Sequence, residues 1–234
     1  PHDTAKLSIL ACLMSLAVAC VSHDRSQLAL TVDRVANPDK GTAVVLATVT
    51  DKRRFRAQAP GEGAGARLVG DLLFGVRGGS PHHGSTASLD SWEETRDPAL
   101  RARTIARPYD GQGIPGGNIL LPAGDSVTET VRGVLETGLR EAGYRVVTKG
   151  SAAAKGALTL DTEIEDYWGW STNGNQMYQR TRINLIGDWP LREPLDFIFL
   201  QTNIQAILPN AEDWNKLFKA SHADLRAKLK QVLK

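Results

Sequence analysis

Residues 126–147 read SVTETVRGVLETGLREAGYRVV, and this stretch predicts an amphipathic helix, a stop and a short strand. Its apolar residues recur every three or four positions, which places them on one stripe of a helix; they are Val127, Val131, Val134, Leu135 and Leu139. Ser126 and Glu129 have the spacing of a capping box, which satisfies free N–H groups of the first turn. Gly143 can adopt the left-handed conformation that ends a helix, and residues 144–147 then read as a buried strand. A helix with such a stripe must pack against apolar strands.

Two strands are predicted before this helix. In residues 28–32, Leu28, Leu30 and Val32 alternate with smaller or polar residues, as in a half-buried strand. Residues 42–50 are rich in Val, Leu and Thr and predict a buried strand. The NPDKG sequence between them is a turn. The two strands could pair as a hairpin or flank the sheet separately.

Three further strands and a helix are predicted after it. Residues 158–165 alternate apolar and polar side chains, which is typical of a half-buried strand. Asn173-Gly174 is a strong hairpin signal, so residues 176–188 should return antiparallel, with residues 195–208 as a third antiparallel strand. The last helix should begin at Asn210 or Asp213.

These elements predict an α/β (α+β) fold with one mostly antiparallel sheet and the central and C-terminal helices on one face. We expect a single domain over residues 28–234. Its least regular part is an excursion at about 78–125, which is rich in glycine and proline and holds a short helix near 98–106 and a strand near 118–121. Long irregular connections inside a domain are often functional.

The N-terminal residues 1–19 predict an export signal. Residues 7–19 read LSILACLMSLAVA, with Lys6 ahead of them. Thirteen residues without a charge are too few to span a bilayer as a helix, but they match the apolar core of a signal peptide. Ala17-Val18-Ala19 fits an ordinary signal peptidase site, and Cys20 follows at once.

Cys20 leaves two alternatives open. It stands where a bacterial lipoprotein carries its lipid, and this resembles a lipobox, although Ala17 replaces the usual Leu, Val or Ile. Plain secretion would instead leave Cys20 as an unpaired thiol in an oxidising compartment. We favour lipidation, with residues 20–27 as the lipidated cysteine and its tether. Val21, rather than Asp, follows the cysteine, which in known lipoproteins implies the outer membrane, facing the periplasm.

Composition limits the choice of partners. The 234-residue chain has 41% apolar residues, enough for a core, and a net charge of only +2. A nucleic-acid surface needs a concentrated basic stripe, so no nucleic-acid partner is expected. The one basic run is Lys52-Arg53-Arg54 with Arg56, and we interpret it as a solvated strand end rather than a site for a polyanion.

The sequence predicts no enzyme, cofactor or metal site. His82-His83 could bind a metal, but zinc needs three or four ligands. Glu163 and Glu165 share the polar side of an alternating strand, the ordinary solvent-facing arrangement. A nucleophile elbow and a Cys/His pair are both absent from the sequence. The alternative is an envelope hydrolase whose site lies in the excursion, with candidate residues His82, His83, Asp90 and Glu93.

The expected binding site surrounds the Asn-Gly hairpin. Aromatic and arginine side chains are the usual anchors of an interface, and six of them gather here: Tyr167, Trp168, Trp170, Tyr178, Arg180 and Arg182. The alternative is that the rings cover one end of the core beneath the last helix.

Several motifs together resemble a known family. These are the lipobox-like Cys20, Val49-Thr-Asp51-Lys-Arg53 as a V-x-D-x-R pattern, an apolar patch with Gly75, the helix followed by AGYRVV, and ALTLDTEIEDYW. In this order they resemble the YajG-like lipoproteins of Gram-negative bacteria. More loosely they resemble auxiliary lipoproteins of envelope ABC transporters and LpoB-type activators of peptidoglycan synthases. The resemblance implies a non-enzymatic accessory or scaffold that is held at the membrane and binds an envelope protein or another envelope component, and it brings no catalytic residues.

Overall fold

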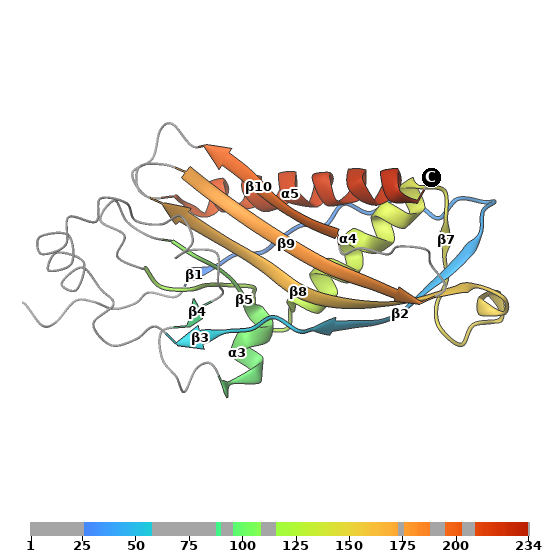
Figure 1. The fold of residues 1–234 in the computed structure, drawn as a ribbon, viewed down its shortest axis with the longest axis horizontal. Coiled ribbons are helices and arrows are strands. Elements are labelled where there is room, and N and C mark those ends of the chain that lie inside the picture. Colours follow the sequence, from blue (N-terminus) through green and yellow to red (C-terminus); the bar gives the residue numbers. More distant parts are fainter. Residues whose placement is uncertain are drawn as a thin grey trace, which may run out of the picture.

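The structure is a computed structural model that describes residues 26–57, 88–89, 96–108, 116–172, 176–187, 195–202 and 209–233. Figure 1 shows the elements, which in chain order are β1 (Ser26–Gln27), β2 (Ala43–Asp51), β3 (Arg56–Ala57), β4 (Ser88–Leu89), α3 (Pro98–Arg103), β5 (Thr104–Arg107), β6 (Ile119–Leu120), α4 (Val127–Glu141), β7 (Arg145–Val146), the short 3₁₀ helix η3 (Ala152–Ala154), β8 (Leu158–Thr172), β9 (Gln176–Gly187), β10 (Leu195–Thr202) and α5 (Ala211–Val232).

The long strand β8 organises the sheet. On one side it pairs antiparallel with β9 from Leu160 to Thr172, and β9 pairs antiparallel with β10. On the other side two strands lie end to end: β2 runs parallel to the first half of β8, and β5 runs parallel to its last residues. Beyond these, β7 joins β2, and β6 and then β1 continue from β5.

The sheet is therefore mixed, and the expectation of a mostly antiparallel sheet was wrong in this detail. The α+β class is confirmed. The pairs β2–β8, β5–β8, β2–β7 and β1–β6 are parallel, whereas β8–β9, β9–β10 and β5–β6 are antiparallel. Parallel strands need a long crossover between them, and here α4 lies in the connection from β2 to β8.

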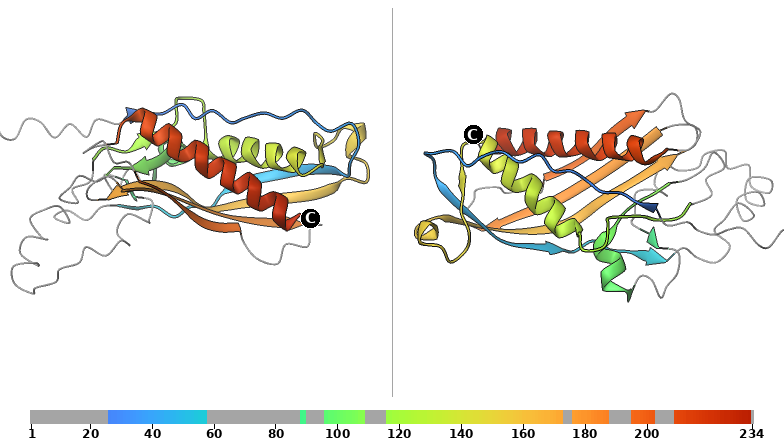
Figure 2. Two further views of the ribbon diagram at one scale, coloured as in Figure 1. Left: turned by 90° about the horizontal axis from the view of Figure 1, so that it is seen from above. Right: turned by 180° about the vertical axis from the view of Figure 1, so that it is seen from behind.

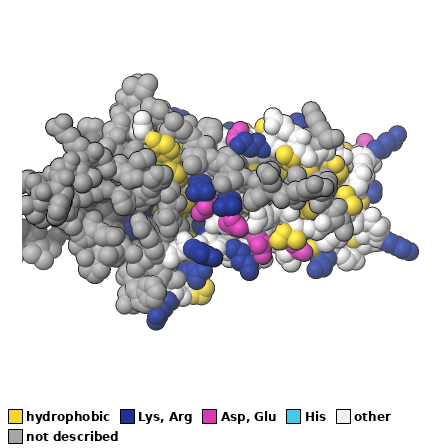
Figure 3. All heavy atoms as spheres, viewed as in Figure 1, with side chains coloured by type: hydrophobic (Ala, Val, Ile, Leu, Met, Phe, Trp, Pro, Cys, Tyr) yellow, Lys and Arg dark blue, Asp and Glu magenta, His cyan; other side chains and the backbone are white. Residues whose placement is uncertain are grey.

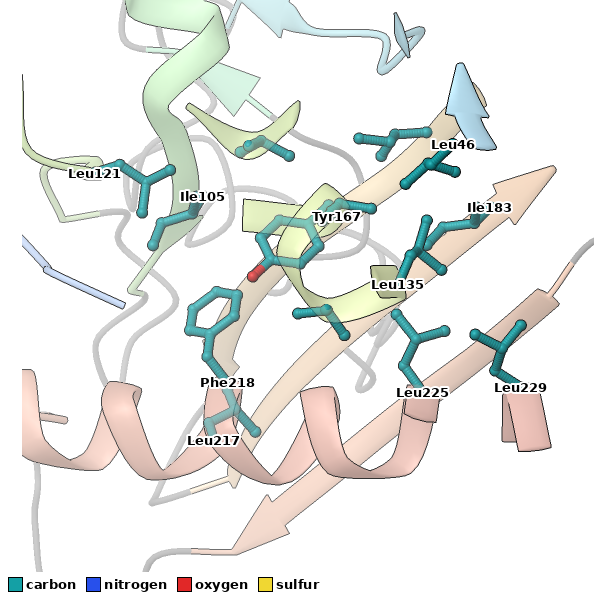
Figure 4. Packing of buried hydrophobic residues seen from close by; sticks show 14 of the residues in the cluster. Leu46, Ile105, Leu121, Leu135, Tyr167, Ile183, Leu217, Phe218, Leu225 and Leu229 are labelled. Carbon is teal, nitrogen blue, oxygen red and sulfur yellow. The ribbon is translucent and has the colours of Figure 1, made fainter. Parts of the chain in front are cut away.

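Helices α4 and α5 pack together on one face of the sheet (Figure 2). The predicted stripe of α4 is buried throughout, and its side chains meet Leu217, Leu225 and Leu229 of α5 in a single core (Figure 4). The serine half of the predicted capping box is confirmed, because the hydroxyl of Ser126 accepts a hydrogen bond of 3.2 Å from Glu129 N, whereas the Glu129 side chain pairs with Arg132; at the other end Gly143 has a φ of 92°. Asn210 caps α5 in a capping box with Asp213.

The predicted strand at 28–32 is instead an extended strap that crosses the helix layer. Only Ser26–Gln27 forms a strand, and it pairs with β6 rather than with β2. Beyond it, Leu28 is buried, and Leu30 and Val32 pack against the core. Side chains hold the strap in place of a β-ladder: Thr137 Oγ1 donates to Asp33 O at 2.6 Å, and Arg226 contacts the Asp33 carboxylate at 3.2 Å.

The second half of the predicted excursion is part of the sheet. Asp97 caps α3 by accepting hydrogen bonds from Ala99 N and Leu100 N, and β5 follows α3 directly. All four residues of β5 are buried, as is β6. Residues in 78–125 that lie between these pieces fall outside the described ranges. Within the part of the chain that is described, no helix has both the length and the apolar character needed to cross a membrane.

Candidate binding surface

A β-bulge at Glu165 decides which way the aromatic side chains of β8 point. The pairing of β8 with β9 shifts register between Ile164 and Asp166. Before the bulge, Leu160, Thr162 and Ile164 face the helices and are buried. An extra residue in a strand moves every later side chain to the other face, so beyond the bulge the odd-numbered residues face the helices.

Tyr167 is therefore a core residue, and the expectation that it lies on a binding surface was wrong. It is only 1% exposed. Its ring centroid lies 5.5 Å from that of Phe218, and Figure 4 shows it pointing from β8 toward α5. Two positions on, Gly169 allows α5 to come close, because a Cβ there would lie 2.9 Å from Trp214 Cζ3. For Tyr167 the alternative of a ring beneath the last helix is the one that the structure shows.

Trp168 and Trp170 point to the face of the sheet opposite α4 and α5, which we call the opposite face. They form a second apolar cluster with Phe55 and Tyr178, and the rings of Trp170 and Tyr178 stack with centroids 5.1 Å apart. Trp168 is 0% and Trp170 3% exposed, so neither ring offers surface to a partner in this structure. Tyr178 is half-buried.

Arg180 and Arg182 lie beside this cluster on the opposite face and are partly exposed. Arg180 Nε lies 3.3 Å from Asp166 Oδ2, and Arg182 Nε lies 2.9 Å from Glu165 Oε2. Lys52 continues the row at 3.9 Å from Glu163. Solvent-exposed ion pairs contribute about 0–1 kcal/mol to stability, and these pairs are partly exposed. Figure 3 shows this face, with acidic and basic side chains close together along its middle.

The basic run at Lys52 contains one residue whose role the sequence did not reveal. Arg53 is only 2% exposed, so the interpretation of this run as a solvated strand end was wrong at this position. Its guanidinium binds both oxygens of the Asp51 carboxylate, at 3.0 and 2.8 Å. It also donates to three backbone carbonyl oxygens, those of Arg101, Thr104 and Tyr167. The D-x-R motif thus joins β2, α3, β5 and β8.

Two buried polar contacts lie between α5 and the sheet. The hydroxyl of Tyr167 and Nε2 of His222 share a hydrogen bond of 2.7 Å, and Ser221 donates to the side chain of Gln179. Burial lowers the pKa of His222 to about 4, and the nearby Arg226 acts in the same direction, whereas Asp33 opposes them. Burial also raises the pKa of Tyr167 above its usual value, against the opposing charge of Arg53. Both groups are therefore neutral near pH 7. The hydrogen bond between them is closed off from solvent and links α5 to the sheet.

A hollow of about 480 Å³ separates the strap from α4. Its lining combines Leu30 and Val32 with charged residues, among them Arg132, Glu136 and Arg140. These arginines already have partners: Arg132 donates to Leu46 O at 2.9 Å, and Arg140 donates to Glu136 at 3.1 Å and to Asn37 at 3.1 Å. Both arginines that line the hollow are therefore engaged within the fold.

The other predicted sites cannot be placed. Cys20, His82, His83, Asp90 and Glu93 lie outside the described residues. Within the described ranges, no three His, Cys, Asp or Glu side chains come together as metal ligands would.

No protein-family model and no curated protein matches the chain. Similar solved structures include the following two. One is of an uncharacterised protein, with a TM-score of 0.45, 10% identity, and coverage of 90% of this chain and 99% of the other. The second is of a protein from Xanthomonas campestris of the DUF330 family, with a TM-score of 0.37, 12% identity, and coverage of 86% and 92%. Similarity at this level assigns no function, and membership of the YajG-like family stays a prediction.

Proposed function

We propose that this chain is a lipid-anchored protein of the bacterial outer membrane, faces the periplasm, and acts as a non-enzymatic accessory or scaffold by binding an envelope protein. Cys20 carries the anchor in this proposal, and the resemblance to YajG-like lipoproteins supports it. Stable anchoring needs more than one acyl chain, because each buried CH₂ contributes about 0.8 kcal/mol. The three chains of a mature lipoprotein meet that need.

The opposite face is the observation that carries the binding role. Arg180 and Arg182 stand there with 27% and 39% of their side chains exposed, next to the aromatic cluster. A partner that supplies acidic groups could replace Asp166 and Glu165 as their counter-ions. The exchange would keep each arginine paired while burying both in an interface, where arginines are frequent anchors.

Trp170, which lies beside these arginines, has an unsatisfied polar group. Its indole Nε1 is buried and has no hydrogen-bond partner, although buried donors are almost always satisfied. An unpaired donor of this kind costs about 1–3 kcal/mol. Because the ring is only 3% exposed, this donor lies out of a partner's reach, and the binding role rests on the arginines alone.

Arg180→Ala with Arg182→Ala is expected to weaken partner binding by about 2 kcal/mol, roughly thirty-fold in Kd. The domain itself should lose no more than about 1 kcal/mol for each exposed ion pair removed. Photocrosslinking in cells, from a crosslinking residue placed at Tyr178, should capture one discrete partner in the parent chain and far less of it in the double variant.

Lys219→Gln with Lys230→Gln is the matched control, because it removes two positive charges from α5 on the other side of the sheet. It should leave the crosslinked species unchanged. Equal capture by the arginine variant and the parent would contradict a binding role for this face. Tryptophan variants are unsuitable for this experiment, since Trp168 and Trp170 are buried and truncating them would also remove core packing.

A further inference from the structure

Two basic stretches that are distant in the sequence meet beside α3. Of the fifteen residues in 51–57 and 96–103, seven are basic and two are acidic, whereas the whole chain has a net charge of only +2. These two stretches therefore carry a local excess of positive charge that the overall composition does not show.

Specific contacts fix the two stretches against each other. Arg53 donates to the backbone oxygen of Arg101 at 2.7 Å. The ring of Phe55 lies between the two guanidinium groups, with its centroid 5.0 Å from Arg53 Cζ and 5.6 Å from Arg101 Cζ. Both distances suit cation–π contacts, so the arrangement of positive charges is built into the fold.

We call four of these side chains, which are exposed or partly exposed, the basic patch: Lys52, Arg54, Arg101 and Arg103. Figure 3 shows Lys and Arg side chains gathered toward α3 and the end of β2. The two acidic residues of these stretches have other roles, because Asp51 binds Arg53 and Asp97 caps α3. Glu163, which lies outside the two stretches, is 3.9 Å from Lys52 and offsets part of the charge of the patch.

The basic patch lies close to the point where the N-terminal tether enters the fold. Ser26 of β1 pairs with Ile119 of β6. Two residues further on, Leu121 N donates to Arg103 O and Arg103 Nε donates to Leu121 O, both at 2.8 Å. Cys20 precedes Ser26 by only six residues, and a chain of that length spans at most about 22 Å. A lipid on Cys20 would therefore keep the patch near the membrane surface.

We propose that the basic patch docks on the phosphate groups of an anionic lipid surface, that of the membrane which holds the anchor. The proposal rests on the lipid anchor proposed above. Attraction of this kind acts only within about a Debye length of the surface, roughly 10 Å, and the short tether allows the patch to come that close. Docking would orient the domain on the membrane, whereas the acyl chains alone would leave it free to swing.

The experiment uses the secreted chain with Cys20→Ala, which has no lipid and so isolates the patch. It should sediment with phosphatidylglycerol vesicles at low salt and lose most of this binding at high salt or on phosphatidylcholine vesicles. Lys52→Gln with Arg54→Gln should weaken the binding about thirty-fold, at roughly 1 kcal/mol for each charge. Both side chains are exposed, so the melting temperature should stay within a few degrees of that of the parent.

Lys219→Gln with Lys230→Gln removes the same charge elsewhere and should weaken vesicle binding much less. Equal losses in the two double variants would overturn the proposal, since they would show attraction to net charge alone. Two further results would also overturn it: displacement from the vesicles by millimolar inorganic phosphate, which indicates a site for a free anion, and tighter binding to a DNA duplex than to the vesicles.

The experiments can refute the docking proposal and the lipid-anchor proposal independently of each other. If native Cys20 carries no lipid but the Cys20→Ala chain still binds anionic vesicles through Lys52 and Arg54, docking stands and the anchor does not. If Cys20 is lipidated and the patch variants bind like the parent, the anchor stands and docking is refuted.

Discussion

Replacing Arg53 with methionine is expected to destabilise the domain by about 3 kcal/mol or more. Methionine keeps much of the volume but removes every hydrogen bond of the guanidinium, so Asp51 and three carbonyl oxygens lose their donor. Removing one partner of a buried ion pair costs this much because the other group remains without compensation. Urea unfolding at pH 7.5, followed by tryptophan fluorescence, would measure the change in free energy.

Arg54→Met is the natural control, since Arg54 is the exposed neighbour of Arg53 and its loss should change stability by less than about 0.5 kcal/mol. Arg53→Lys should fall between the two, because lysine keeps the charge but cannot reach several acceptors at once. If Arg53→Met unfolded at the same urea concentration as Arg54→Met, the role of the D-x-R motif in joining four elements would be wrong.

The stability of the domain is expected to fall by about 3 kcal/mol on account of His222 alone when the pH drops from 7.5 to below 4. Burial holds the folded pKa of His222 at about 4, below the ordinary value of 6.5 for histidine. The unfolded chain therefore takes up this proton first as the pH falls. The contribution is fully present above pH 6.5, declines below it, and is gone once the pH has passed through the folded pKa.

His222→Gln separates this effect from the titration of carboxylates. Glutamine can still hydrogen-bond to Tyr167 but cannot be protonated, so the variant should lose less stability than the parent between pH 7.5 and 5. Urea unfolding at half-unit pH steps would show the difference in slope. Parallel curves for the two proteins would mean that His222 is accessible to protons in the folded state.

The helices could be predicted from sequence because their signals are local. The stripe of α4, its cap at Ser126 and its stop at Gly143 all lie within one stretch. The order of the strands in the sheet could not be predicted from sequence. Periodicity does not identify pairing partners that are distant in the chain, and here β2 and β5 both pair with the same edge of β8. The strap was misread for a related reason: Leu28, Leu30 and Val32 alternate as in a strand, but side chains of α4 and α5 hold it.

The candidate site was predicted in part. Arg180 and Arg182 alternate with buried residues of β9. Because side chains in a strand point to alternate faces, the sequence pattern could place both arginines on the polar face. Tyr167 was misplaced because the bulge at Glu165 reverses the pattern, and the only sign of it in the sequence is that the apolar alternation breaks after Ile164. Arg53 was missed because its neighbours are solvated. The alternate spacing of Asp51, Arg53 and Phe55 at the end of β2 and just beyond it could have indicated it.

Mass spectrometry of the mature N-terminus tests the central claim, that this is a lipid-anchored envelope protein, most directly. The protein would be extracted from membranes with detergent, and its intact mass and N-terminal fragment would be measured. The account predicts a chain that begins at Cys20 and carries a diacylglyceryl group and an amide-linked acyl chain. An unmodified Cys20, or a chain that retains residues 1–19, would contradict it.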